Sequence, residues 1–228
     1  MGKIKEKMKS IPLAKKIFYN IIKFHPHRLV FKLNLRKVEK FDRKHGTDFS
    51  GRMYWNEIGT SRDRANDYSP SPMDLIETLE SENISNSDSI VDMGCGKGYA
   101  MYLMAKYPFA CVGGVELSRS LCDIAVCNLK KVMPKSLKWN VFHCDAGKWN
   151  KYDEYNIFYI YNSFPKVVMQ EVKEMIEKSI ESNPRRVKIW YLNPQYPEVF
   201  LDDKKNWKLE KRRLLRLRGG MHIFTNMY

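Results

Sequence analysis

The sequence Ile90-Val91-Asp92-Met93-Gly94-Cys95-Gly96-Lys97-Gly98-Tyr99 decides the fold of this chain. It begins with a short apolar run, which is typical of a buried strand. Three glycines follow, and residues 99–106 are mostly good helix formers. A strand, a glycine turn and a helix in this order predict an open α/β sheet with a ligand site at the carboxyl end of its first strand. Glycine suits such a turn because it adopts positive φ and lets a ligand approach the backbone.

The spacing of the glycines narrows the choice of ligand. A dinucleotide site has the pattern G-x-G-x-x-G, whereas here Gly94, Gly96 and Gly98 alternate with other residues and Asp92 precedes them. This pattern resembles motif I of the class I S-adenosylmethionine (SAM) methyltransferases. The resemblance implies SAM as the cofactor, with Asp92 near the ammonium group of its amino-acid end. A tight turn without a ligand is the alternative for the glycines alone.

Glu116 ends the next apolar run. Residues 109–118 predict the second parallel strand, and Glu116 stands 22 positions after Gly94. In nucleoside-binding sheets an acid at this place binds the ribose hydroxyls, since one carboxylate can accept hydrogen bonds from both. The alternative is an acid at the start of a helix, where its negative charge interacts favourably with the helix dipole. Its distance from the glycine motif makes ribose binding the preferred interpretation.

Four further cofactor contacts come from the resemblance. Residues 137–143 predict the third strand, and Asp145 with Ala146 follows it. SAM methyltransferases commonly place an Asp beside a small residue there. The resemblance implies that Asp145 accepts a hydrogen bond from the adenine amino group and that a neighbouring backbone amide donates to the adenine ring. A Tyr-x-Pro-Ser-Pro element implies that Tyr68 and Ser71 flank the methionine end. Turn formation by Asp145, burial of Tyr68 and helix capping by Ser71 are the alternatives.

Asn162 is the predicted catalytic position. It follows the fourth predicted strand, 155–161, in the sequence Asn-Ser-Phe-Pro. This departs from the Asp/Asn-Pro-Pro-aromatic motif of amino methyltransferases and is similar to the Asn-x-Phe element of the histone-lysine methyltransferases that lack the SET fold. Asn162 would align the methyl acceptor through its side-chain carbonyl, although it could also simply start a turn beside a buried Phe164. Because no general base stands out, nitrogen is mildly favoured over oxygen as the acceptor atom.

The remaining elements complete an α/β fold. A helix is predicted over 166–182, a fifth strand over 186–192, and an antiparallel pair from 207–217 and 221–228 around two glycines. The prediction is therefore a Rossmann-like, seven-stranded methyltransferase sheet that is mostly parallel and ends in an antiparallel hairpin. The resemblance covers about residues 66–228.

A basic helical extension is predicted at residues 1–50, before a methyltransferase domain at 51–228. Residues 1–52 hold 15 Lys and Arg against 4 Asp and Glu, which is most of the surplus behind the net charge of +14. A second basic cluster lies at 204–218. One helix is expected near 4–22 and another over 29–45, with apolar residues at helical spacing. Either the extension covers the domain, or it docks on an anionic partner, a membrane surface or RNA.

Five cysteines without a C-x-x-C pair predict reduced thiols in a cytoplasmic protein, with attachment to the membrane surface left open. Neither they nor the five histidines have the spacing of a metal site. The sequence thus predicts a SAM-dependent methyltransferase with an unidentified acceptor, N-methylation of a protein or another amine being mildly favoured. The alternatives are a methyltransferase directed at RNA, a nicotinamide-dependent oxidoreductase, and a non-catalytic protein that binds SAM or nucleic acid.

Overall fold

The computed structural model of the chain describes residues 26–71, 74–213 and 220–227. The helix predicted near residues 4–22 lies outside this part of the chain, and so does the predicted start of the helix after Ser71. Within the described residues no helix is both long and apolar enough to cross a membrane.

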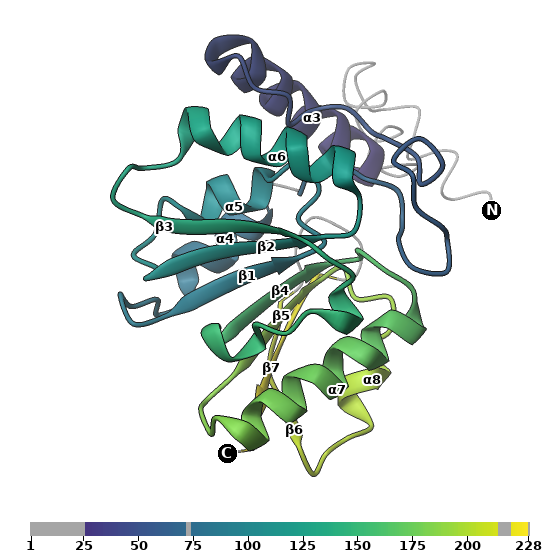
Figure 1. The fold of residues 1–228 in the computed structure, drawn as a ribbon, viewed down its shortest axis with the longest axis vertical. Helices are drawn as coiled ribbons and strands as arrows, with labels where there is room; N and C mark the ends of the chain where they lie inside the picture. Colours follow the sequence, from purple (N-terminus) through teal and green to yellow (C-terminus); the bar gives the residue numbers. More distant parts are fainter. Residues whose placement is uncertain (1–25, 72–73, 214–219, 228) are drawn as a thin grey trace, which may run out of the picture.

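A seven-stranded sheet forms the centre of the fold (Figure 1), in the order β3-β2-β1-β4-β5-β7-β6. The first five strands pair in parallel, whereas β7 pairs antiparallel with β5 and β6. This confirms the predicted sheet and its antiparallel end. The chain direction across the sheet reverses beside β1, and ligands of open α/β sheets bind at such a switch point. The strands are β1 Ser89–Met93, β2 Cys111–Glu116, β3 Lys138–His143, β4 Ile157–Tyr161, β5 Lys188–Leu192, β6 Trp207–Arg213 and β7 Met221–Asn226.

Helices cover both faces of the sheet (Figure 1). One buried cluster joins the strands to α3, α4, α5 and α6, and the other joins them to α7, α8 and two short 3-10 helices. The α7 helix has the predicted bounds, while α8 and the 3-10 helices were not predicted. The helices are α3 Pro26–His45, α4 Asp74–Ser81, α5 Tyr99–Met104, α6 Arg119–Val132, α7 Lys166–Ser182 and α8 Glu198–Leu201, with 3-10 turns at Ala146–Lys148 and Tyr152–Glu154.

The end of α3 is anchored in the domain beside the glycine motif. Phe49 is fully buried and its ring lies 5.4 Å from that of Tyr99. The Asp42 carboxylate accepts hydrogen bonds from the Phe49 and Ser50 amides and from the Thr47 hydroxyl. Burial disfavours the charge of Asp42, but these bonds outweigh it and lower its pKa. This part of the extension therefore covers the domain, and the division at residue 50 stays a prediction.

Candidate active site

One pocket of about 670 Å³ opens at the carboxyl ends of β1 to β4. Nine of the ten predicted site residues line it, and their individual roles stay predictions. The exception is Gly98, which begins α5 with a φ of 86° and lies against Leu129, so it shapes the turn. The nine are Tyr68, Ser71, Asp92, Gly94, Gly96, Glu116, Asp145, Ala146 and Asn162.

Two glycines of the motif are required by their neighbours. Gly94 and Gly96 both have positive φ, 90° and 52°. A Cβ on Gly94 would lie 2.4 Å from the side chain of Ser163, and one on Gly96 would lie 2.3 Å from the ring of Tyr68. Tyr68 is fixed in turn because its hydroxyl donates to the Phe49 carbonyl at 2.7 Å. The glycine turn is thus packed between residues that come from distant parts of the chain.

Asp92 and Glu116 are buried carboxylates at the ends of neighbouring strands, 3% and 6% exposed. Each Glu116 oxygen accepts one backbone N–H, from Gly96 and from Ser118, both at 2.8 Å. Each oxygen therefore keeps acceptor capacity for a hydroxyl group. No described residue donates a hydrogen bond to the carboxylate of Asp92. Burial raises the pKa of both groups, and the charge of Glu116 raises that of Asp92 further. A cationic group beside Asp92 would offset the free-energy cost of burying its negative charge.

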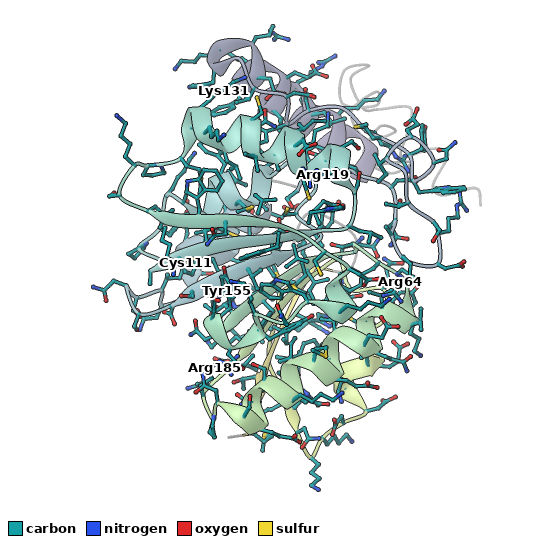
Figure 2. All side chains as sticks on the ribbon, viewed as in Figure 1. Arg64, Cys111, Arg119, Lys131, Tyr155 and Arg185 are labelled. Carbon is teal, nitrogen blue, oxygen red and sulfur yellow. The ribbon has the colours of Figure 1, made fainter. Side chains whose placement is uncertain are left out.

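Asp145 is held by Arg64, a residue that the sequence did not single out. The position of Arg64 is labelled in Figure 2. Arg64 donates to both Asp145 oxygens at 2.5 to 2.9 Å, and it also donates to Glu171 of α7 at 2.7 and 2.9 Å. Hydrogen bonds to Glu171 and then Asp145 raise the pKa of Arg64, so it is a permanent cation. The site therefore contains a three-residue ion cluster at the Asp for which the resemblance implied a contact with the adenine amino group.

Asn162 stands at the end of β4 in a left-handed conformation, with a φ of 48°. Its backbone carbonyl accepts from the Asn66 amide side chain at 2.8 Å, and the Ser163 carbonyl accepts from the Asn66 N–H at 3.0 Å. Its own Oδ1 is buried and has no hydrogen-bond partner among the described residues. Asn162 itself lines the pocket, so an unused acceptor belongs to one of the pocket-lining side chains.

The segment 51–71, which we call the strap, runs over the carboxyl ends of the strands. The Ile58 carbonyl accepts from the Ser118 hydroxyl at 2.6 Å, beyond β2. Arg64 reaches the end of β3, and Asn66 reaches the end of β4. These contacts join residues up to 96 positions apart and leave no local pattern, so they could not be predicted from the sequence.

The described residues contain no group of three or more side chains arranged for a metal ion, and the five cysteines are free thiols. Burial raises the pKa of four of them, Cys95, Cys111, Cys122 and Cys144. The candidate chemistry of the pocket therefore depends on its carboxylates, amides and arginines.

Comparisons with known proteins place this site in a family. No curated protein matches the chain. The glycopeptide N-methyltransferase MtfA complexed with SAM is 8% identical, with a TM-score of 0.52 over 67% of this chain and 91% of that chain. A Streptococcus mutans protein in complex with SAH is 9% identical, with a TM-score of 0.50 over 70% and 98%. Both show a shared fold, and neither supports the predicted similarity to histone-lysine methyltransferases.

The sequence profile of a methyltransferase family matches residues 38–176, which is more than half of the chain. The match includes the end of α3, the strap, the glycine motif and the carboxyl ends of β1 to β4. The chain therefore belongs to the protein-L-isoaspartate(D-aspartate) O-methyltransferase family and is a class I SAM-dependent methyltransferase.

Proposed function

We propose that this methyltransferase transfers the methyl group of SAM to a nitrogen atom of an acceptor that carries an N–H group. The observation that carries this proposal is the unpartnered Oδ1 of Asn162. A buried acceptor without a donor costs about 1–3 kcal/mol, so a group that donates to it is favoured on binding. Asn162 Oδ1 would orient such a nitrogen without adding a negative charge beside it.

The residues of the pocket fit SAM. Asp92, which no described residue bonds, suits the ammonium group, and Glu116 keeps acceptor capacity for two hydroxyls. When bound, SAM supplies a methyl group made electrophilic by its sulfonium centre. The protein then has to hold the nucleophile in line and exclude water, and positioning of this kind is worth roughly 7–11 kcal/mol.

Among the described residues on the methyl-acceptor side of the pocket, none offers an unpaired side chain that could act as a general base. Asp67 is paired with Arg52 at 2.8 Å, and Asp145 is paired with Arg64. Burial raises the pKa of Tyr161 to about 12, so it does not take up protons from an acceptor near neutral pH. A hydroxyl acceptor needs a base, whereas a neutral amine or a ring nitrogen attacks with its own lone pair.

A carboxylate acceptor is the second candidate, because the family description is that of an O-methyltransferase. A carboxylate needs no base, and Arg52 and Arg62 line the pocket and would attract it. It cannot, however, donate a hydrogen bond to Asn162 Oδ1. For that reason it ranks behind nitrogen.

The product distinguishes the two candidates. Purified protein, labelled methyl SAM and fractionated cell extract should give a product that keeps its label in mild alkali. A methyl ester would lose the label as volatile methanol, which would contradict N-methylation. Asn162→Ala should lower turnover at least tenfold with little change in SAM affinity. Asn193→Ala is the matched control, since Asn193 ends β5 with a φ of 49° but does not line the pocket.

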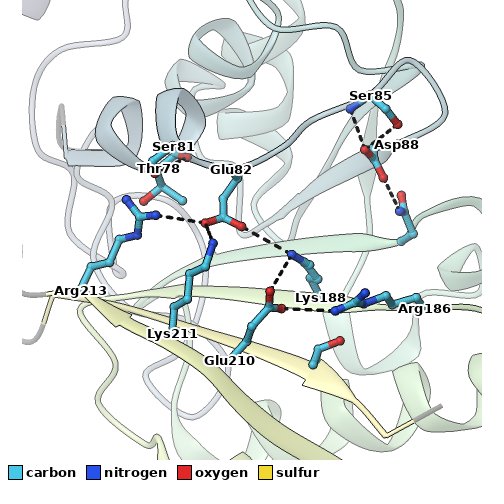
Figure 3. Close-up of polar contacts among 12 residues, drawn as sticks. Thr78, Ser81, Glu82, Ser85, Asp88, Arg186, Lys188, Glu210, Lys211 and Arg213 are labelled. Carbon is cyan, nitrogen blue, oxygen red and sulfur yellow. Dashed lines mark hydrogen bonds and ion pairs between the residues drawn. The ribbon is translucent and has the colours of Figure 1, made fainter.

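We also propose an anionic partner for α3. Its exposed cations form no ion pair with any described residue, whereas Lys188, Lys211 and Arg213 are paired with Glu82 (Figure 3). Because Val38 and Phe41 pack against the domain, this part of the apolar side of α3 is not free to enter a bilayer. This favours RNA over a membrane surface. The unpaired residues are Lys32, Arg36, Lys37, Lys40, Arg43 and Lys44.

A further inference from the structure

The carboxylate of Asp145 has little acceptor capacity left. A carboxylate offers about four lone-pair sites. Oδ1 accepts from Arg64 Nη2 at 2.5 Å and from the Gly147 N–H at 3.0 Å. Oδ2 accepts from Arg64 Nε at 2.9 Å and from Arg64 Nη2 at 2.7 Å. Three of these four contacts come from one guanidinium group. The two hydrogens of Nη2 are shared among both Asp145 oxygens and Glu171 Oε2, so the position of Arg64 decides how much of Asp145 is left to accept from another group.

Asp145 nevertheless lies where the base of the cofactor is expected. β2 pairs in parallel with β3, and Glu116 stands opposite His143 in that register. A nucleoside whose ribose is held by Glu116 therefore has its base near the residues that follow β3, which are Cys144, Asp145 and Ala146. An adenine amino group at this end needs an acceptor, and Arg64 already takes up most of the Asp145 carboxylate.

We propose that Arg64 is a positioning residue that competes with the adenine amino group for Asp145 and moves onto Glu171 when the cofactor binds. The inference rests on the proposed function, since it takes SAM as the ligand.

Glu171 is already placed to receive the guanidinium. Its Oε1 accepts from Arg64 Nη1 at 2.9 Å, and its Oε2 accepts from Nη2 at 2.7 Å. Its side chain is 38% exposed and that of Asp145 is 18% exposed, so Glu171 has more room to follow the cation. Gly147 makes this approach possible, because a Cβ there would lie 2.2 Å from Glu171 Oε2. The exchange keeps the charge of Arg64 paired at every stage.

The exchange also connects the cofactor with the strap. Arg64 and Asn66 lie two positions apart, and Asn66 holds the backbone of Asn162 and Ser163. Release of Asp145 by Arg64 would therefore loosen the strap at the end of the pocket where the adenine base is expected. The contact of Asn66 with the backbone of Asn162 and Ser163 would stay in place.

Two ligands that differ in one amino group test the proposal. S-Adenosylhomocysteine carries the amino group, and its deaminated form, S-inosylhomocysteine, has an oxygen in that place. In the wild-type protein, calorimetry should give dissociation constants that differ little, because Arg64 offsets the gain from the amino group. In Arg64→Ala the adenosyl ligand should bind about tenfold more tightly than to the wild type, and it should be preferred to the inosyl ligand by about tenfold or more.

Matched variants decide whether this effect belongs to Arg64. Arg52→Ala also removes a strap arginine, but its partner Asp67 lies within the strap, so the wild-type ratio should remain. Gly147→Ala should displace Glu171, strengthen the hold of Arg64 on Asp145 and weaken the adenosyl ligand. Equal or weaker binding to Arg64→Ala, with an unchanged ratio, overturns the competition while leaving the methyltransferase assignment intact. If no variant binds the adenosyl ligand, the proposed function fails and this inference fails with it.

Discussion

The ring of Tyr68 lies directly against the backbone of Gly96, where a Cβ would come within 2.3 Å of it. The two residues are far apart in the sequence, and the contact brings the strap onto the glycine motif. Lys97 strengthens it, because its ammonium group lies 5.5 Å from the ring centroid and donates to Asp48 at 2.8 Å. The glycine motif is therefore both a candidate cofactor site and the anchor of the segment that covers it.

Gly96→Ala should cost more stability than backbone strain alone explains. The added methyl group would meet Tyr68, and overpacking of this kind costs roughly 1–3 kcal/mol. Gly46→Ala is the control, since Gly46 has a φ of 66° with nothing within 4 Å of its Cβ position. Urea unfolding of both variants gives the difference. Equal losses would show that the contact with Tyr68 carries no energetic weight.

Asp92→Asn should stabilise the protein above neutral pH while weakening SAM. Burial, and then the nearby Glu116, raise the pKa of Asp92 well above 3.8. The folded protein therefore binds a proton more tightly than the unfolded chain, and it loses stability as pH rises from about 4 through the folded pKa. The variant avoids this loss, so at pH 8 its free energy of unfolding should be higher by roughly 1–3 kcal/mol. Urea unfolding at pH 5 and pH 8 measures it, and a less stable variant at pH 8 contradicts the account.

The local part of the site could be predicted from the sequence, because each residue stands at the end of an apolar strand. Asp92, Glu116, Asp145 and Asn162 follow such runs, the resemblance to SAM methyltransferases supplied most of their expected roles, and all four line the pocket. Arg64 could not be found, since an arginine in a polar loop has no periodicity and its partner Asp145 lies 81 positions away. Its effect on Asp145 is visible only once the chain is folded.

The boundaries of the helices and strands show the same difference between what local sequence patterns predict and what long-range packing determines. Strands with continuous apolar runs and the long amphipathic α7 were predicted to within a few residues. The α8 helix has 4 residues and the 3-10 turns have 3, and elements this short carry no periodic pattern. Tertiary packing of residues such as Phe200 and Trp149 determines them.

His222 predicts a loss of stability in weak acid. The ring is buried on β7, its Nε2 accepts from Arg212 Nε at 2.9 Å, and its Nδ1 has no partner among the described residues. Burial, and then the charge of Arg212, lower its pKa below 6.5. The unfolded chain therefore takes up a proton first, and stability falls as pH drops below about 6.5. His222→Gln should reduce this fall in thermal unfolding between pH 7 and pH 5. An unchanged fall would assign the acid sensitivity to other groups.

The cations of α3 predict RNA binding that weakens steeply with salt. Lys37, Lys40 and Lys44 recur at intervals of three or four residues, so they lie along one side of the helix about 4.5–6 Å apart along its axis. Each phosphate contact to a single strand contributes about 0.7 to the slope of log affinity against log salt. Changing all three lysines to Gln should therefore lower that slope by roughly 2 in a filter assay with total RNA.

The control removes the same charge elsewhere on the surface. Lys204, Lys205 and Lys208 are exposed and form no ion pair with a described residue, and changing them to Gln should leave the slope nearly unchanged. Equal effects of the two triple variants would mean that RNA responds to net charge and not to α3. Sedimentation with anionic liposomes in the absence of RNA binding would replace RNA with a membrane surface as the partner. In either case SAM affinity should stay at the wild-type value, because none of the six lysines lines the pocket.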